Sequence, residues 1–211
     1  MSRWVCLDVG ETLIDETRVW TCWAVALGET PLTFMAAMGA VLARGRDFRD
    51  TFEFLGHPDW ERLRPQVAAA YVGFQESDLY PDVRPTIDGL RAAGYRLAII
   101  ANQPAERTDE LRFLGVRAEV MGMSAEMGVH KPAPEFFAEA LRRMGDPTPS
   151  NVVYVGDRLD NDIHPAAAAG MRTVWIRRGP WAAITTDLPP QGTLVVESLT
   201  ELFGRIAEVW K

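Results

Sequence analysis

Lysine is nearly absent from this chain of 211 residues. Of its 22 lysines and arginines, only Lys131 and Lys211 are lysines. Because 29 acidic residues outweigh them, the formal net charge is −7, which argues against a general basic surface that binds nucleic acid. A local cationic pocket for a small anion remains compatible with this balance, and the scarcity of lysine draws attention to Lys131.

Cysteine, histidine and long apolar runs are also scarce. Cys6 and Cys22 form no CxxC pair, so the sequence predicts neither a disulfide framework nor a structural zinc site. The three histidines lie far apart and have no metal-ligand spacing. No apolar run approaches the ~18 residues of a membrane-spanning helix, and the four apolar residues before Asp8 are too few for a signal peptide. We therefore expect a cytoplasmic protein without a membrane partner.

The chain instead contains short apolar runs separated by helical patterns. Continuous apolar residues that end at a turn are typical of strands buried on both faces of a parallel sheet. The runs that predict strands are Trp4–Leu7, Arg96–Ala101, Val116–Met121, Val152–Val155 and Thr173–Ile176. Strands that alternate with helices predict an α/β fold, a doubly wound parallel sheet of Rossmann-like type.

A long helical insertion follows the first predicted strand. Helical patterns run from Glu16 to Gly28, onward from Thr30-Pro31, over Phe48–Leu55 and onward from Pro58. The aromatic side chains there recur at helical spacing, which favours a hydrophobic core over a ligand cage. We predict a Rossmann-like core from residues 1–14 and 79–211, and a small helical cap domain from residues 15–78.

Polar residues follow successive predicted strands. In chain order they are Asp8, Asn102, Lys131, Asp157 and Asp162. Parallel strands joined by right-handed crossovers place their carboxyl ends at one edge of the sheet, where ligands bind. Three carboxylates at that edge suit Mg²⁺, which takes hard oxygen ligands, keeps several waters and is often shared with a substrate phosphate.

Each of these residues also has a purely structural interpretation. Asp8 could form an Asx turn or cap a helix, Asp157 and Asp162 could cap the helix that follows them, and Lys131 could be a solvated residue. Calcium binding of the EF-hand type is excluded because the required glycine and distal glutamate are missing. The occurrence of all five residues in this order favours a functional site over separate structural roles.

Four segments carry a resemblance to a known family. They are LDVGETL (7–13), IIANQ (99–103), GVHKPAPEFF (128–137) and VGDRLDNDI (155–163). In this order they resemble the motifs of the haloacid dehalogenase superfamily of aspartate-nucleophile hydrolases. The segment 79–100 is similar to the subgroup (subfamily IA-like, C1) that carries a helical cap between the first two motifs.

The resemblance implies a role for each matching residue. Asp8 would attack the substrate and bind Mg²⁺, and the carbonyl of Gly10 would be a second ligand. Asp157 and Asp162 would hold the metal directly or through water, while Lys131 would neutralise nucleophile and phosphate. This is physically reasonable, because a carboxylate attacks a phosphoryl group only when cations screen the two anions from each other.

Two positions depart from the family pattern. Phosphatases of the family usually carry a second Asp two residues after the nucleophile as general acid and base, whereas this chain has Gly10. The second motif usually supplies a hydroxyl group, whereas this chain has Ala101. We expect substrate contacts at Thr12, Ala101 and Asn102, and Glu11 is the candidate for the missing acid. General acid catalysis contributes about 10²–10⁴-fold, so its loss would slow or specialise the enzyme.

The resemblance leads to one main functional hypothesis and two alternatives. The main hypothesis is a Mg²⁺-dependent phosphatase that acts on a small phosphorylated metabolite through an aspartyl-phosphate intermediate. The first alternative is a catalytically degenerate protein of this fold that serves binding or regulation. The second is a haloacid dehalogenase, although those enzymes place an aromatic residue at the position of Gly10. A phosphonate hydrolase would need a lysine in the cap, and the cap has none.

Overall fold

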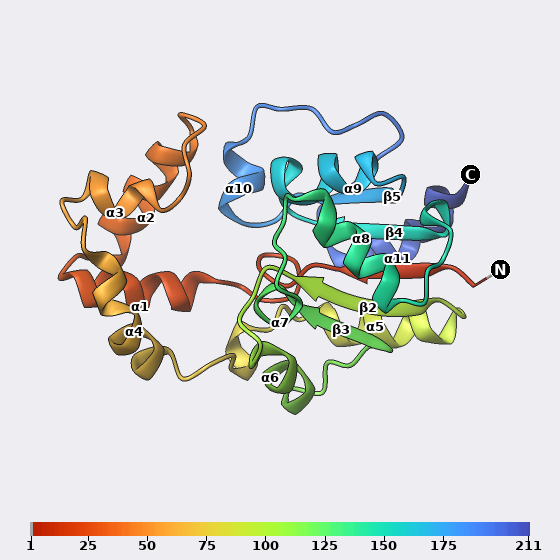
Figure 1. Cartoon of the computed structure of the whole chain (residues 1–211), viewed down its shortest axis with the longest axis horizontal. Helices are drawn as coiled ribbons and strands as arrows, with labels where there is room; N and C mark the ends of the chain where they lie inside the picture. The colour runs from red at the N-terminus through yellow and green to blue at the C-terminus, as the bar shows by residue number, and fades with distance from the viewer. Residues whose placement is uncertain (1) are drawn as a thin grey trace.

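The computed structural model describes residues 2–211 and contains a parallel sheet covered by helices, with a group of helices to one side (Figure 1). Within these residues the sheet has six strands in the order β3-β2-β1-β4-β5-β6, and every pair is parallel. The strands are β1 (Trp4–Leu7), β2 (Arg96–Ala101), β3 (Val120–Met123), β4 (Val152–Gly156), β5 (Arg172–Ile176) and β6 (Leu194–Val196). The predicted α/β class with a parallel, Rossmann-like sheet is confirmed.

Two strands differ from the sequence prediction. The third strand begins at Val120 rather than Val116, because Val116 is used to end the preceding helix: its N–H donates to the carbonyl of Leu111, and its side chain is buried. Strand β6 was not predicted. It has only three residues, too few for a periodic pattern to show.

The central strand β1 is buried on both faces. Val5 and Leu7 face one hydrophobic cluster, and Trp4 and Cys6 face another. The first cluster includes side chains from α5 (Val83–Ala92), α6 (Arg107–Phe113) and α11 (Leu199–Arg205), and the second from α8 (Pro134–Arg143) and α9 (His164–Ala168). This three-layer arrangement explains why β1 is apolar without alternation.

The helices between β1 and residue 72 lie together, on the left in Figure 1, and most of them share a hydrophobic cluster of their own. They are α1 (Thr17–Leu27), α2 (Pro31–Leu42), α3 (Asp50–Phe54), the 3₁₀ helix η1 (Trp60–Leu63) and α4 (Arg64–Tyr71). Aromatic side chains fill this cluster, and the rings of Phe52 and Trp60 stack with centroids 4.2 Å apart. The interpretation of the aromatic residues as a core is confirmed.

Among residues 2–211, no single helix is long and apolar enough to cross a membrane. Helices α1 and α2 reach that length and composition only as a pair, bent by 107° at the break between them. Their buried apolar side chains form part of the hydrophobic cluster just described.

Short helices complete the chain. They are η2 (Glu76–Asp78), α7 (Ser124–Met127), η3 (Pro149–Asn151), the π-helical turn η4 (Leu159–Ile163), α10 (Gly179–Ile184) and η5 (Ile206–Trp210). Helix α10 packs against α1: the ring centroids of Trp181 and Trp20 are 6.2 Å apart. The turn η4, which follows β4, carries one of the candidate ligands, Asp162.

Candidate active site

Three aspartates meet at the carboxyl edge of the sheet. Asp8 directly follows β1, Asp157 directly follows β4, and these two strands are neighbours. Asp162 comes from η4, the turn that returns the chain over the same edge. All three are buried, and each offers a carboxylate oxygen within 4.8 Å of the others. The sheet thus brings together all three acids that the sequence singled out.

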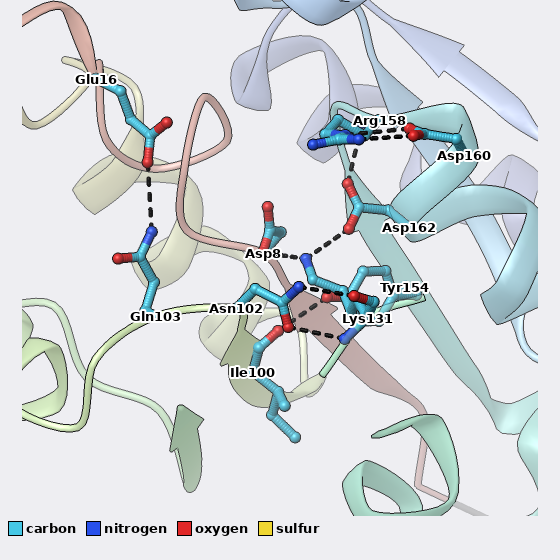
Figure 2. A network of polar contacts seen from close by, with 10 residues as sticks. All are labelled: Asp8, Glu16, Ile100, Asn102, Gln103, Lys131, Tyr154, Arg158, Asp160 and Asp162. Atoms are coloured by element: carbon cyan, nitrogen blue, oxygen red, sulfur yellow. Dashed lines mark hydrogen bonds and ion pairs between the residues drawn. The ribbon is translucent and has the colours of Figure 1, made fainter. Parts of the chain in front are cut away.

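Lys131 lies between two of these acids (Figure 2). Its Nζ donates to Oδ1 of Asp8 at 2.6 Å and to Oδ1 of Asp162 at 2.5 Å. The lysine side chain is only 2% exposed. Burial alone would lower the pKa of Lys131, but Asp162 and Asp8 outweigh burial and raise that pKa above its ordinary value. The ammonium group therefore stays charged in the interior.

The backbone of Lys131 is held by Asn102. Oδ1 of Asn102 accepts from the N–H of Lys131 at 2.8 Å, and its Nδ2 donates to the carbonyl of Lys131 at 3.0 Å. Asn102 follows β2, so this pair of bonds ties the loop before α8 to the sheet. In the described structure Asn102 positions the lysine, and its predicted contact with substrate stays a prediction.

One carboxylate oxygen of the cluster lacks a partner. Oδ2 of Asp157 is buried and has no hydrogen-bond partner among residues 2–211. Burial, with Asp162 and Asp8 nearby, raises the pKa of Asp157 well above its ordinary value. Burial also raises the pKa of Asp8 to about 6, with Lys131 opposing and Asp162 adding to the shift. Since a buried carboxylate without partners is costly, this oxygen-rich group fits a hard divalent cation such as Mg²⁺.

Thr12 and Ala101 lie at the same edge but make no polar side-chain contact there. Oγ1 of Thr12 is buried without a hydrogen-bond partner in the described part of the chain. Ala101 ends β2, is fully buried and offers only a methyl group. The predicted contacts of Thr12 and Ala101 with a substrate stay predictions, and Ala101 could contribute only shape or its backbone.

Glu11, the candidate for the missing acid, has both carboxylate oxygens engaged. Its Oε1 accepts from the N–H of Glu16 at 2.9 Å, and its Oε2 accepts from the hydroxyl of Tyr80 at 2.7 Å. The residue is 4% exposed and has a positive φ of 49°. In this structure Glu11 ties the turn after β1 to the start of α1 and to Tyr80.

Glu16 was not singled out from the sequence, yet its carboxyl group lies against the turn that carries Gly10. A Cβ atom on Gly10 would come within 2.6 Å of Oε1 of Glu16. Oε1 also accepts from Nε2 of Gln103 at 3.3 Å (Figure 2). Burial, together with the nearby Glu11 and Asp8, raises the pKa of Glu16 to about 8, against the opposing effects of Gln103 and Lys131. The only signal in the sequence was Gly10 itself, whose missing side chain leaves space for another group.

Arg158 was also missed, although it lies inside a recognised motif. Its backbone N–H donates to Oδ2 of Asp162 at 3.0 Å, while its side chain pairs with Asp160. Oδ1 of Asp162 is bonded to Lys131, so Asp162 is held at both oxygens.

Comparison with solved structures supports the fold, a parallel α/β sheet covered by helices. The magnesium-bound structure of the putative HAD-hydrolase YfnB from Bacillus subtilis superposes with a TM-score of 0.74 at 19% identity, over 96% of this chain and 97% of that one. At this identity the likeness concerns the fold.

Sequence comparison then identifies the family. The model for haloacid dehalogenase-like hydrolases matches residues 3–170, and the chain belongs to this family. A glyceraldehyde 3-phosphate phosphatase of Methanopyrus kandleri is 44% identical over 124 residues, 54% of this chain and about half, 52%, of that protein. One from Pyrococcus furiosus is 27% identical over 94% of this chain and 90% of that protein. The predicted superfamily and enzyme class, a hydrolase, are confirmed.

The aspartate cluster predicts a measurable response to Mg²⁺. A ligand that binds only the folded protein raises its stability, so Mg²⁺ should raise the Tm of the wild type. The Asp157→Asn variant removes one charge and an unpartnered oxygen, and Mg²⁺ should raise its Tm far less. Calorimetry with and without Mg²⁺ measures this, and an equal shift in both proteins would contradict the assignment of Asp157 as a ligand.

Protons should compete with Mg²⁺ for the cluster. Because the pKa of Asp8 is raised to about 6 in the folded protein, that group takes up a proton more readily than in the unfolded chain. Its contribution to the stability of the metal-free protein therefore falls as pH rises from about 4 to about 6. Metal binding needs ionised carboxylates. We expect the rise in Tm caused by Mg²⁺ to be larger at about pH 8 than at about pH 5; equal rises would contradict this.

Removal of the buried lysine should destabilise the metal-free protein. Lys131→Met leaves Asp8 and Asp162 facing each other in the interior. Removal of one partner of a buried ion pair lowers the free energy of unfolding by about 3–5 kcal/mol. Denaturant unfolding near neutral pH measures this loss, and Mg²⁺ should recover part of it. Lys211→Met, which changes the exposed lysine, is the matched control. Equal midpoints for the two variants would show that Lys131 is not needed to balance the acids.

Proposed function

We propose that this protein is a Mg²⁺-dependent phosphatase that acts on a small phosphorylated metabolite. The observation that carries the proposal is the buried Asp8, bonded to Lys131 and grouped with Asp157 and Asp162. The family and the names of its relatives support the same reaction class.

The proposed nucleophile is the carboxylate of Asp8. It would attack phosphorus, the bond from phosphorus to the leaving oxygen would break, and an acyl phosphate would form on Asp8. Water would then attack that phosphorus, which releases phosphate and restores the carboxylate. Two anions must approach each other in the first step, so the reaction depends on nearby positive charge.

Positive charge would come from two sources. Lys131 already contacts Asp8 through its Nζ, and Asn102 fixes its backbone, so the ammonium group needs little reorganisation during the reaction. Asp8, Asp157 and Asp162 would hold Mg²⁺, with the carbonyl of Gly10 as a further proposed ligand. The bound ion would supply charge neutralisation for the phosphoryl group.

The substrate should be small. Asp8 is 6% exposed and Lys131 is equally buried, so the reacting phosphate must enter an enclosed site at the edge of the sheet. The unpartnered hydroxyl of Thr12 is a candidate donor to a phosphate oxygen. Because relatives are named glyceraldehyde 3-phosphate phosphatases, triose phosphates are the first substrates to test.

The alternatives rest on two residues. Gly10 supplies no acid and Ala101 supplies no hydroxyl group, which favours a degenerate protein that binds without turnover. The missing acid is also compatible with a haloacid dehalogenase, because halide leaves without a proton. Both alternatives predict no release of phosphate, so one experiment distinguishes them from the main proposal.

The experiment is a screen for phosphate release from phosphorylated metabolites, with and without Mg²⁺ and with Asp8→Asn as control. We expect release only with Mg²⁺ and only by the wild type, together with a phosphate label on the protein that Asp8→Asn lacks. Release of halide from 2-haloacids would favour the dehalogenase. Mg²⁺ binding without turnover of any substrate would favour the degenerate protein.

A further inference from the structure

The proposed reaction needs a proton donor that none of the groups assigned so far provides. An alkyl phosphate leaves as a strongly basic alkoxide unless a side chain protonates it, and such protonation is worth about 10²–10⁴-fold. Lys131 is occupied by two carboxylates, and Asp157 and Asp162 belong to the metal cluster. The donor must therefore be another acid near Asp8.

Glu11 is poorly suited to this role. Its two oxygens accept hydrogen bonds from the hydroxyl of Tyr80 and the backbone N–H of Glu16. Burial raises the pKa of Glu11 above its ordinary value, although these two hydrogen bonds oppose the shift, and neither oxygen is left free to meet a substrate atom. To donate a proton to a substrate, Glu11 would have to give up the contacts that join the turn after β1 to α1.

Glu16 has the freedom that Glu11 lacks. It forms no ion pair with a basic side chain among residues 2–211, and its carboxyl group receives one long hydrogen bond, 3.3 Å from Gln103. Its nearest charged neighbours include Glu11, Asp8 and Lys131. An acid that is held in place but lacks a strong partner is available to a substrate atom.

The position of this carboxyl group depends on Gly10. A Cβ on Gly10 would lie 2.6 Å from Oε1 and 2.9 Å from Cδ of Glu16, closer than such atoms approach each other. The carboxyl group thus occupies the space that a side chain two residues after Asp8 would fill. Because the carboxyl group is the far end of a flexible side chain, a side chain on residue 10 would displace it from this position.

We propose that Glu16 is the general acid and base of this site, which rests on the phosphatase function proposed above. As the bond from phosphorus to the leaving oxygen breaks, its electron pair stays on that oxygen, which takes the proton of the Glu16 carboxyl group. The resulting carboxylate then takes a proton from the water that attacks the aspartyl phosphate. Glu16 is protonated again when phosphate leaves.

The leaving group provides the test, because only a poor leaving group needs the proton. The Glu16→Gln variant should lower kcat/KM for an alkyl phosphate, such as a triose phosphate, by about 10²–10⁴-fold. The same variant should lower kcat/KM for p-nitrophenyl phosphate by less than about tenfold, since p-nitrophenolate departs unaided. Glu53→Gln, which removes an exposed acid of α3, is the matched control and should change neither value.

Two further variants separate chemistry from folding. Gly10→Ala keeps Glu16 but displaces its carboxyl group, and should give the same selective loss on alkyl phosphates. Gly10→Asp combined with Glu16→Ser moves a carboxyl group onto residue 10, and should restore alkyl phosphate hydrolysis relative to Glu16→Ser alone. Thermal unfolding of every variant identifies any protein that fails to fold.

Two results would overturn the assignment of Glu16 while leaving the phosphatase in place. One is a Glu16→Gln protein that keeps full activity on alkyl phosphates. The other is an equal loss on alkyl and aryl phosphates in folded Glu16→Gln, which would give Glu16 a structural role. If the wild type hydrolyses neither substrate with Mg²⁺ present, the phosphatase proposal fails and the role of Glu16 falls with it.

Discussion

The ammonium group of Lys131 between Asp8 and Asp162 is the contact around which the site is organised. Buried charges are tolerated only when they are paired, and this edge of the sheet holds more acid than its lysine can balance. Asp157 keeps an unpartnered oxygen as a result. The excess negative charge in the interior is the physical reason that a divalent cation fits here, and it links the stability of the core to its proposed chemistry.

The fold supplies the rigidity that this arrangement needs. Strands β1 and β4 are adjacent, so the aspartates that follow them lie close together without any long loop. Asn102 ties the backbone of Lys131 to the end of β2, and the backbone of Arg158 holds the second oxygen of Asp162. Side chains placed in this way are preorganised for a charged substrate, which lowers the reorganisation that the reaction requires.

One departure from the family pattern, Gly10, lies against a side chain from further along the chain. Gly10 and Glu16 are six positions apart, and the carboxyl group of one fills the space beside the other. Glu11 turns away to bind Tyr80 and the start of α1. The space left by the missing side chain of Gly10 therefore holds a carboxyl group, carried by the residue that precedes α1.

The sequence by itself determined the fold class, because short apolar runs alternate with helical patterns. Strand β2 was predicted at its observed bounds for the same reason. The sequence also determined the family and the acids and lysine of the cluster, because these lie in four motifs in a fixed order. It did not determine the start of β3, where Val116 ends a helix instead, nor β6, which is too short to show a pattern. Only the tertiary structure decided that Asn102 holds Lys131 and that the carboxyl group of Glu16 lies in the space beside Gly10. Spacing along the chain predicts which residues share an edge of a sheet, whereas the direction of a side chain in a turn depends on the atoms packed around it.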